Sequence, residues 1–419
     1  MIRFHSTSGF SALLCSFREA FSRRSWPYWL ATSVSWLVHT GQRHIRLLST
    51  RAGWSRHESG YYRFFSAFKF NPESFAKHLL GLIIQSFGLT ELLIAVDDTL
   101  CPKWGKKIYG TAIFYDHVKR PNPGYIWGHD WVVLAVVVHL FGRPVALPFW
   151  VSLYRPQKLC SKGEFRTRLQ IVAAVLQKVK TWFPQRISLV VDGAYFNKSL
   201  LRPLAPMGID VVGRLRSDAA LRSDPPAKKK GPGRKKRYGK ALPKLKQIAK
   251  SSQGWEIIQV TIYGKVHRLR IKVVDAWWKV ARLKIRVVVT RALADNRPPC
   301  YLATTNLSLS PKVIIERFAL RWQIEQLFSD AKQLMGLDSA EIRKERSVCR
   351  HAQFTFSLVT LTRLWAKTTF ARSSQPPSSF RNQLSELRVD LLAHTISRAI
   401  PRGVLSARYH RALGELAAA

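Results

Sequence analysis

The apolar segment ELLIAVDDTL, at residues 91–100, restricts the possible folds more than any other part of the chain. Residues 92–96 form an unbroken apolar run, which is typical of a central strand buried on both faces of a sheet. The run ends in two carboxylates, Asp97 and Asp98, and a similar segment, RISLVVDGAYF at 186–196, ends its apolar run at Asp192. Because open α/β sheets place catalytic groups and ligands at strand ends, these segments predict an α/β fold with an acidic site at one edge of its sheet.

A third carboxylate can reach this site from the helix expected at 317–332, RFALRWQIEQLFSDAK. At about 100° per residue, three side chains lie within roughly 40° of Glu325 on a helical projection: Phe318, Arg321 and Lys332. Glu316 and Asp330 point away from this stripe. A buried carboxylate is costly unless it meets a cation, and three carboxylates together supply the oxygen ligands of a Mg²⁺ site. The alternative is an ordinary i,i+4 surface pair between Arg321 and Glu325.

The charge balance indicates the class of partner. The chain of 419 residues has 68 Lys and Arg against 25 Asp and Glu, a formal net charge of +43, and its hydrophobic content of 47% allows a large core. Such a charge predicts binding to the phosphates of a nucleic acid. A generally adhesive basic protein of the ribosomal kind is the alternative. Basic residues are spread over the whole chain, which disfavours a membrane surface as the partner.

Cysteine usage and hydropathy indicate the compartment. Five widely spaced cysteines without a CxxC pair predict reduced thiols. The histidines are not grouped at the spacing of metal ligands, so a zinc site is not expected. The most apolar segment, 131–154, is interrupted at 142–144 and predicts two buried strands joined by a turn rather than a membrane helix. The first residues make a poor signal peptide. We therefore expect a cytoplasmic protein that associates with the nucleoid through DNA and has no membrane partner.

Composition changes along the chain and predicts four regions. They are a helical, DNA-binding region at 1–88, a core at 89–213 and 296–345, a basic loop and β unit at 214–295, and a helical C-terminal region at 346–419. A helical cap on the core is the alternative for the first region, in which Asn71 and Gly88 are expected to begin and end a helix. The basic stretch 224–246 is either a solvated linker or a DNA-contacting arm.

The β unit carries alternating charge. In LRIKVV, Leu269, Ile271 and Val273 are expected to point one way, whereas Arg270 and Lys272 point the other way. The segment LKIRVVV at 283–289 repeats this alternation. Both segments predict an antiparallel β unit with a cationic outer face.

Three short motifs follow one another in a recognisable order. VDDT at 96–99, VVDGAYF at 190–196 and the pattern F-x2-R-x3-E-x6-K at 318–332 resemble the first-Asp, second-Asp and Tyr-Arg-Glu-Lys motifs of cut-and-paste insertion-sequence transposases of the DDE type. Asp97, Asp192 and Glu325 are separated by 95 and 133 positions. The resemblance covers about residues 90–345, and Phe318 stands where the signature has tyrosine.

The resemblance implies a ribonuclease-H-like catalytic core, an antiparallel β unit inserted between the second Asp and the Glu, and helical N- and C-terminal flanks. It further implies that Asp97, Asp192 and Glu325 are the catalytic residues and the metal ligands. Asp98 is the alternative to Asp97, because strand alternation lets only one of them face the site. The family pattern D-x-T favours Asp97, since Thr99 follows it at that spacing.

The implied function is that of a DNA transposase, which cuts at the ends of an insertion sequence and joins them to target DNA. Phosphoryl transfer would use two Mg²⁺ ions, for which Mn²⁺ could substitute. No nucleotide cofactor is expected, because the sequence lacks a GxxxxGK[ST] loop. The expected partners are double-stranded DNA and a second copy of the chain, with a DNA-hairpin intermediate. The expected DNA contacts are Phe318, Arg321, Lys332, Lys103, Lys106, Lys107, Arg270 and Lys272.

Two other functions fit the same sequence. A decayed or regulatory derivative of such an element would bind DNA without cutting it. A metal-dependent nuclease of the same fold would cut DNA without joining strands. Metal-dependent nicking of DNA would distinguish a transposase from the DNA-binding derivative. Specific binding to inverted-repeat ends would distinguish a transposase from the nuclease.

Overall fold

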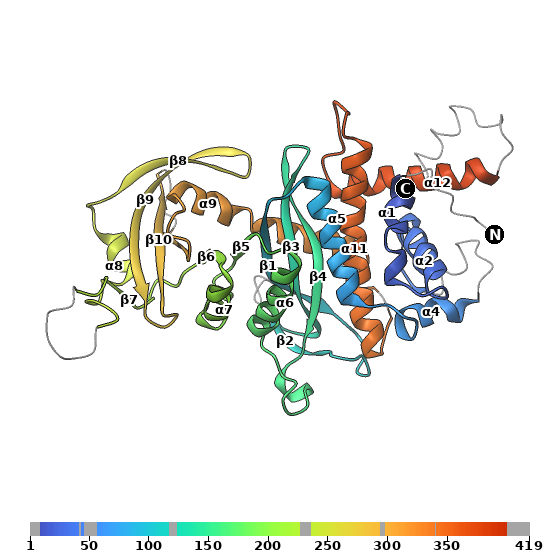
Figure 1. Ribbon diagram of the computed structural model, residues 1–419, viewed down its shortest axis with the longest axis horizontal. Helices are drawn as coiled ribbons and strands as arrows, with labels where there is room; N and C mark the ends of the chain where they lie inside the picture. The colour runs from blue at the N-terminus through green and yellow to red at the C-terminus, as the bar shows by residue number, and fades with distance from the viewer. Residues whose placement is uncertain are drawn as a thin grey trace. The chain divides into compact units, whose positions relative to one another are not determined.

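The computed structural model describes residues 9–41, 43–45, 57–116, 124–226, 236–293, 298–339 and 341–399 (Figure 1). The middle of the basic stretch expected as a linker or DNA-contacting arm, 227–235, lies outside the described residues. The chain divides into two compact units. Unit 1 contains Met1–Leu89, Asp98–Phe165 and Gln326–Ala419, and unit 2 contains Thr90–Asp97 and Arg166–Glu325.

Unit 2 is built on a sheet with the strand order β1-β5-β6-β11-β10-β9-β7, and β8 pairs with β9. The strands are β1 (Glu91–Pro102), β5 (Arg186–Val191), β6 (Ile209–Arg214), β7 (Leu221–Arg222), β8 (Glu256–Ile262), β9 (Lys265–Trp278), β10 (Leu283–Ala292) and β11 (Cys300–Thr304). Strands β1, β5 and β6 are parallel to one another, and the pairs from β6 onward are antiparallel. Strand β1 contributes its residues up to Asp97 to this unit.

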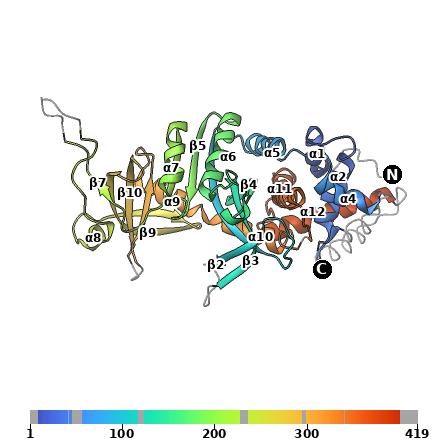
Figure 2. The ribbon, with the colours of Figure 1, turned by 90° about the horizontal axis from the view of Figure 1, so that it is seen from below.

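The parallel strands are the apolar runs of the sequence. In β1, residues 92 and 94–96 are buried, and β5 is buried from Ile187 to its end, which confirms the predicted central strands. Helices α6 (Arg168–Trp182) and α7 (Lys198–Leu204) pack against each other, whereas α9 (Pro311–Ala319) contacts β5, β6, β10 and β11. Figure 2 shows α6 and α7 on one side of β5 and α9 on the other.

The predicted antiparallel β unit is confirmed, and it extends the same sheet. Strands β8, β9 and β10 pair in antiparallel fashion, and β10 continues through β11 to β6. Helix α8 (Leu245–Lys250) precedes these strands, and α9 packs against β8. Figure 1 shows β8, β9 and β10 as long curved strands beside α9.

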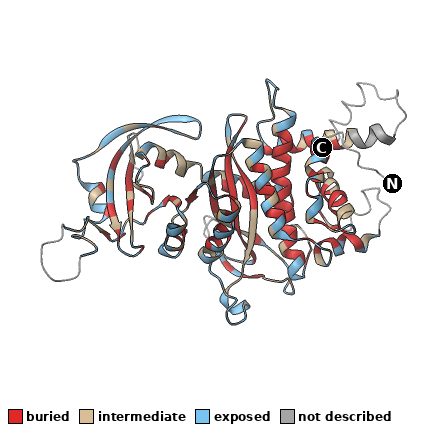
Figure 3. Cartoon of the chain, viewed as in Figure 1, coloured by how far each residue is buried: buried red, intermediate tan, exposed pale blue. Residues whose placement is uncertain are grey.

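Unit 1 is organised around α11 (Glu345–Thr369), which is buried along most of its length (Figure 3). This helix contacts strand β4 and helices on several sides. The other elements of the unit include α1 (Gly9–Cys15), α2 (Trp26–Val38), α4 (Glu58–Ser66), α5 (Pro72–Phe87), α12 (Phe380–Ala399), β2 (Ala112–Asp116), β3 (Gly124–Leu140) and β4 (Arg143–Tyr154). Helix α10 (Trp322–Gln333) contributes its residues from Gln326 onward.

Local sequence signals explain several elements of unit 1. The side chain of Asn71 accepts hydrogen bonds from the amides of Glu73 and Ser74, and Gly88 ends α5 in the left-handed conformation, as predicted. The segment 131–154 forms β3 and β4, joined at Phe141 and Gly142 with φ of 51° and 74°. Positive φ at both positions suits a tight hairpin turn. Among the described helices, none is both long and apolar enough to cross a bilayer.

The fold is therefore α/β, with a ribonuclease-H-like core and helical N- and C-terminal flanks. The four-region division expected from composition stays a prediction.

Candidate active site

Asp97 and Asp192 lie at neighbouring positions in unit 2, where the pairing of β1 with β5 ends. The sequence predicted that the first strand stops at Asp97, but β1 continues to Pro102. The parallel register pairs Glu91 with Arg186 and Val96 with Val191, so Asp97 and Asp192 follow at the next step of both strands. Neighbouring strands are about 4.8 Å apart, and paired residues share a face. The two carboxylates therefore lie side by side, Asp97 within β1 and Asp192 just after β5.

The segment after β5 orients Asp192. Its Oδ1 accepts hydrogen bonds from the backbone amides of Ala194 and Tyr195 at 3.0 and 2.9 Å. Tyr195 and Phe196 are buried, and the ring of Phe196 stacks on Trp278 at a centroid distance of 5.8 Å. The aromatic pair thus anchors the turn, which explains why the motif DGAYF follows a strand here.

Arg321 joins Asp97 to Glu325. Its Nη1 donates to Oδ2 of Asp97 at 2.8 Å, and its Nη2 donates to Oε1 of Glu325 at 2.5 Å. The side chains of Arg321 and Asp97 are 16 and 17% exposed, so this bridge is shielded from solvent. The guanidinium also lies 6.0 Å from the ring centroid of Phe318. Arg321 and Glu325 are therefore not an isolated surface pair, because a second carboxylate from β1 shares the same cation.

The single helix expected at 317–332 is wrong. Helix α9 ends at Ala319 and α10 begins at Trp322, with Leu320 and Arg321 in a turn between them. The amides of Arg321, Gln323 and Ile324 donate to carbonyls three residues earlier, which tightens the chain to a 3₁₀ spacing. A constant 100° per residue does not hold across this turn, although Phe318, Arg321 and Glu325 still meet.

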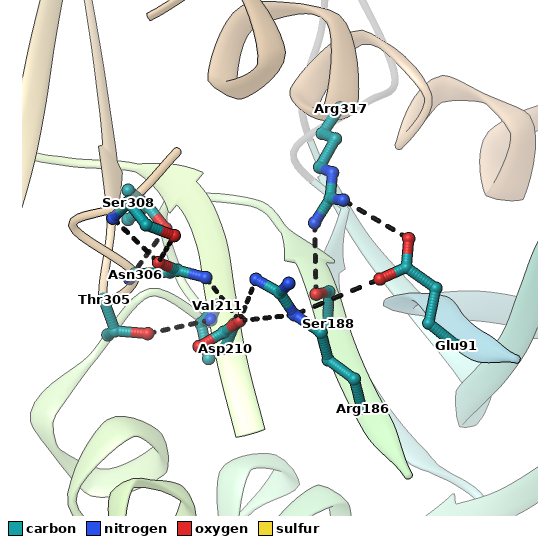
Figure 4. Close-up of polar contacts among 10 residues, drawn as sticks. Glu91, Arg186, Ser188, Asp210, Val211, Thr305, Asn306, Ser308 and Arg317 are labelled. Carbon is teal, nitrogen blue, oxygen red and sulfur yellow. Dashed lines mark hydrogen bonds and ion pairs between the residues drawn. The ribbon is translucent and has the colours of Figure 1, made fainter. Parts of the chain in front are cut away.

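A polar network at the other end of the same strands holds α9 on the sheet (Figure 4). Arg317 of α9 donates to the hydroxyl of Ser188 in β5 at 3.2 Å and pairs with Glu91 at the start of β1 at 3.5 Å. Arg186 pairs with Asp210 of β6 at 3.0 Å. The alternation of β5 places Ser188 and Asp192 on one face, so α9 lies over the face from which Asp192 emerges.

The loop after β11 completes this network. The side-chain Nδ2 of Asn306 donates to Oδ2 of Asp210 at 2.7 Å, and the hydroxyl of Thr305 accepts a hydrogen bond from the backbone amide of Val211 at 2.9 Å (Figure 4). Because this loop leads into α9, it ties the start of the helix to β6. Sequence reasoning missed these residues, since they are ordinary polar residues at strand ends.

Two of the lysines expected to contact DNA make bonds within unit 1. The ammonium of Lys332 donates to the carbonyl of Leu100 at 2.7 Å, and that of Lys103 donates to the carbonyl of Asp338 at 2.8 Å. Burial lowers the pKa of Lys103 from its ordinary value. Lys106 and Lys107 are exposed. A DNA contact remains a prediction for all four.

The predicted cationic face of the β unit is wrong at Lys272. Arg270 is exposed, but Lys272 is only 8% exposed, and its ammonium donates to the carbonyls of Ile248 and Ser251 at 2.9 and 2.8 Å. Val273, expected to face the core, is 40% exposed. Helix α8 and its C-terminal turn provide these carbonyls and cover Lys272, which alternation within one strand cannot anticipate.

A basic pocket of about 900 Å³ lies beside Asp192 in unit 2, and the sequence motifs did not reveal it. Gly193, the residue after Asp192, is part of its wall. The charged residues of the wall are Arg214, Arg216, Asp218, Lys246, Lys250 and Arg291. The spacing of Lys246 and Lys250, four residues apart on α8, was the available signal, because it puts two cations on one helical face.

The donor set suits a divalent metal ion in its chemistry. Asp97, Asp192 and Glu325 offer carboxylate oxygens, which hard cations such as Mg²⁺ prefer. Among the described residues, no group of three or more His, Cys, Asp or Glu is arranged to hold a metal ion. Arg321 instead supplies the positive charge between Asp97 and Glu325. The chemistry of the donors therefore suits such an ion, whereas in this arrangement the arginine occupies two of the three carboxylates.

Comparisons with known proteins identify the family of this chain. The family model described as DDE superfamily endonuclease matches residues 14–270, which include Asp97 and Asp192 and end before Glu325. A cryo-electron microscopy structure of the piggyBac transposase synaptic complex with hairpin DNA is 10% identical, covers 99% of this chain and 79% of that chain, and has a TM-score of 0.45. At this similarity, no residue role is transferred. No curated protein matches the chain. Because the family model matches more than half of the sequence, the chain belongs to the DDE superfamily of endonucleases.

Proposed function

We propose that this protein is a DNA transposase, which cuts DNA at the ends of an insertion sequence and joins those ends to target DNA by phosphoryl transfer. The observation that carries the proposal is the meeting of Asp97 and Glu325 at Arg321, next to Asp192, where the pairing of β1 with β5 ends. Membership of an endonuclease family supports the class of reaction.

In this proposal Asp97, Asp192 and Glu325 are the catalytic carboxylates and would hold Mg²⁺. The bound ion would activate the attacking water or 3′-hydroxyl and stabilise the leaving oxygen. Asp97 is preferred to Asp98, because Arg321 pairs with Asp97 and the register sets Asp97 beside Asp192. Once Arg321 has released the carboxylates, its planar guanidinium can bind two oxygens of a DNA phosphate.

The basic pocket would hold the DNA strand next to the reacting phosphate. Its five basic side chains face a single carboxylate, Asp218, which is already paired with Arg216 at 3.0 Å. Phosphate oxygens are the natural partners of such an excess of cations. A position beside Gly193 keeps that strand close to Asp192. In this proposal the protein binds double-stranded DNA of the element ends and of the target, and it acts as a dimer on that DNA.

The decisive experiment replaces single carboxylates by isosteric amides. In Asp192→Asn and Glu325→Gln, we expect the rate of Mg²⁺-dependent cleavage of element-end DNA to fall by roughly a thousandfold or more, with DNA affinity almost unchanged. The rate should fall because a neutral amide binds a divalent metal ion much more weakly than a carboxylate does. Cleavage is measured on labelled duplexes, and affinity by fluorescence anisotropy.

Glu316→Gln is the matched control. Glu316 lies on α9, and its Oε1 accepts the amide of Thr261 at 2.8 Å, a bond that glutamine can keep. This variant should cleave like the wild type. Cleavage at the wild-type rate in Asp192→Asn or Glu325→Gln would refute the site. Cleavage without joined products would leave a nuclease, and binding without cleavage in the wild type would leave a DNA-binding derivative.

A further inference from the structure

Exposed apolar side chains gather in one short stretch of unit 1. Among the large apolar residues exposed in the described part of the chain, five lie between positions 104 and 127. They are Trp104, Ile113, Tyr115, Tyr125 and Trp127, with exposed fractions of 97, 56, 42, 75 and 37%. A single exposed apolar residue needs no explanation, whereas a contiguous group indicates an interaction surface.

Four of these residues share one face of a two-stranded arm. Strand β2 pairs with the beginning of β3, and the register sets Ile113 opposite Trp127 and Tyr115 opposite Tyr125. The rings of the two tyrosines are 5.4 Å apart. On the opposite face Phe114 is 7% exposed and packs near Tyr154. The arm thus has one packed face and one exposed aromatic face, and Figure 2 shows its two strands running side by side.

The loop after β1 places Trp104 and two cations beside the arm. The indole Nε1 of Trp127 donates to the carbonyl of Gly105 at 3.2 Å, and its own carbonyl accepts the amide of Lys103 at 2.9 Å. These bonds hold the loop against the arm. Lys106 and Lys107 follow directly and are exposed. We call these five apolar residues, together with Lys106 and Lys107, the aromatic arm.

The chemistry of the aromatic arm favours one occupant. Flat exposed rings bind the faces of nucleobases, and neighbouring lysines bind the phosphates between them. In a duplex the base faces are already stacked, so only an unpaired strand offers both groups. A second copy of this chain is disfavoured, because it would bring like charges together in a protein of net charge +43.

We propose that the aromatic arm binds an unpaired DNA strand, with bases stacked on Trp104 and Tyr125 and phosphates held by Lys106 and Lys107. The proposal rests on the proposed function for the identity of the polymer as DNA. It adds a second, single-strand-selective contact in unit 1, separate from the carboxylates and the basic pocket of unit 2.

The test compares strand and duplex binding in full-length protein carrying Asp192→Asn, which prevents cleavage. The ligands are an oligothymidylate of about 20 nucleotides and a duplex of the same length. Trp104→Ala with Tyr125→Thr should lower the affinity for the strand by about tenfold or more, because each base stack is lost. Affinity for the duplex should change by less than about twofold.

The matched control is Tyr263→Asn, which removes a tyrosine that is 63% exposed at the turn between β8 and β9. Asparagine suits the positive φ of 52° at this position, so the fold should be kept. This variant should bind both ligands like its parent. A parallel double variant, Lys106→Ala with Lys107→Ala, should make the slope of log binding constant against log salt concentration less steep for the strand. The expected change corresponds to the loss of about one to two phosphate contacts.

Two results would overturn the proposal. One is an unchanged strand affinity, or an equal loss for strand and duplex, in the Trp104 and Tyr125 variant. The other is a dimer that dissociates in this variant without a loss of strand affinity, which would make the arm an interface between copies. Neither result touches the proposed function, which is tested separately by the cleavage and joining of duplex DNA by the wild-type protein.

Discussion

The two units use their arginines in different ways. In unit 2, Arg186, Arg317 and Arg321 pair with carboxylates that lie on the strands of the sheet or beside it. In unit 1, Arg43 and Arg350 are 4 and 9% exposed and donate to backbone carbonyls. These three arginines of unit 2 therefore meet acids, whereas Arg43 and Arg350 of unit 1 bind backbone carbonyls.

Arg350 illustrates the second use. Its guanidinium donates to the carbonyls of Phe65, Phe68 and Phe70 at 3.3, 2.9 and 3.1 Å, and so ties α11 to the end of α4 and to the segment that follows it. Arg363, 5% exposed, donates to Ala146 of β4 and pairs with Asp330. The net charge of +43 is therefore not all available to DNA, because part of it is bound inside unit 1.

The largest effect expected from this comparison is on stability. Arg350→Met keeps an apolar stem of similar length but leaves three carbonyls without their donor. We expect the free energy of unfolding to fall by about 3 kcal/mol or more, measured by urea denaturation. Arg346→Met, at an exposed position of the same helix, is the control and should change it little. A small decrease in the free energy of unfolding of Arg350→Met would show that water replaces the guanidinium as the donor to these carbonyls. This arginine would then contribute little to the stability of unit 1.

The next effect concerns pH. Burial lowers the pKa of His129 to about 4 and that of His351 to about 3, and both lie in unit 1. An unfolded histidine titrates near 6.5, so below this pH the unfolded chain takes up protons that the folded chain excludes. Stability should therefore be fully present above about pH 6.5 and should fall as the pH drops toward 4.

This pH dependence can be assigned to one residue. In His129→Gln, the loss of stability between pH 7 and pH 5 should shrink by about 2 kcal/mol, followed by urea denaturation at both values. His139→Gln, at an exposed position of the same strand, should leave it unchanged. Unit 2 contains a single histidine, His267, which is exposed. If the loss of stability between pH 7 and pH 5 shrank equally in both variants, the pH dependence would not come from the buried ring of His129.

The smallest effect is expected for a carboxylate pair of unit 2. Arg286 and Asp275 lie 2.7 Å apart with side chains 23 and 37% exposed, and this bond lowers the pKa of Asp275. Asp275→Asn should cost at most about 1 kcal/mol, because partly exposed ion pairs are weak. If urea denaturation gave a loss as large as that of Arg350→Met, the proposed contrast between the units would be wrong.

Local sequence patterns predicted much of this fold. The apolar runs ending at Asp97 and Asp192, the cap at Asn71 and the β3–β4 hairpin depend on neighbouring residues and on a period of two or of about 3.6, and the structure confirms them. Patterns failed where remote segments intervened. The helix at 317–332 breaks near Arg321, and α8 buries Lys272.

The sequence by itself determined that the apolar runs of two buried strands end in carboxylates and that the chain carries a large excess of positive charge. Only the tertiary structure decided where that charge lies. A cation is buried when distant segments supply carbonyls or carboxylates for its hydrogen bonds, as for Arg350 and Arg321, and it stays in solvent when they do not, as for Lys106. No local period records those partners, because they come from elements far apart along the chain.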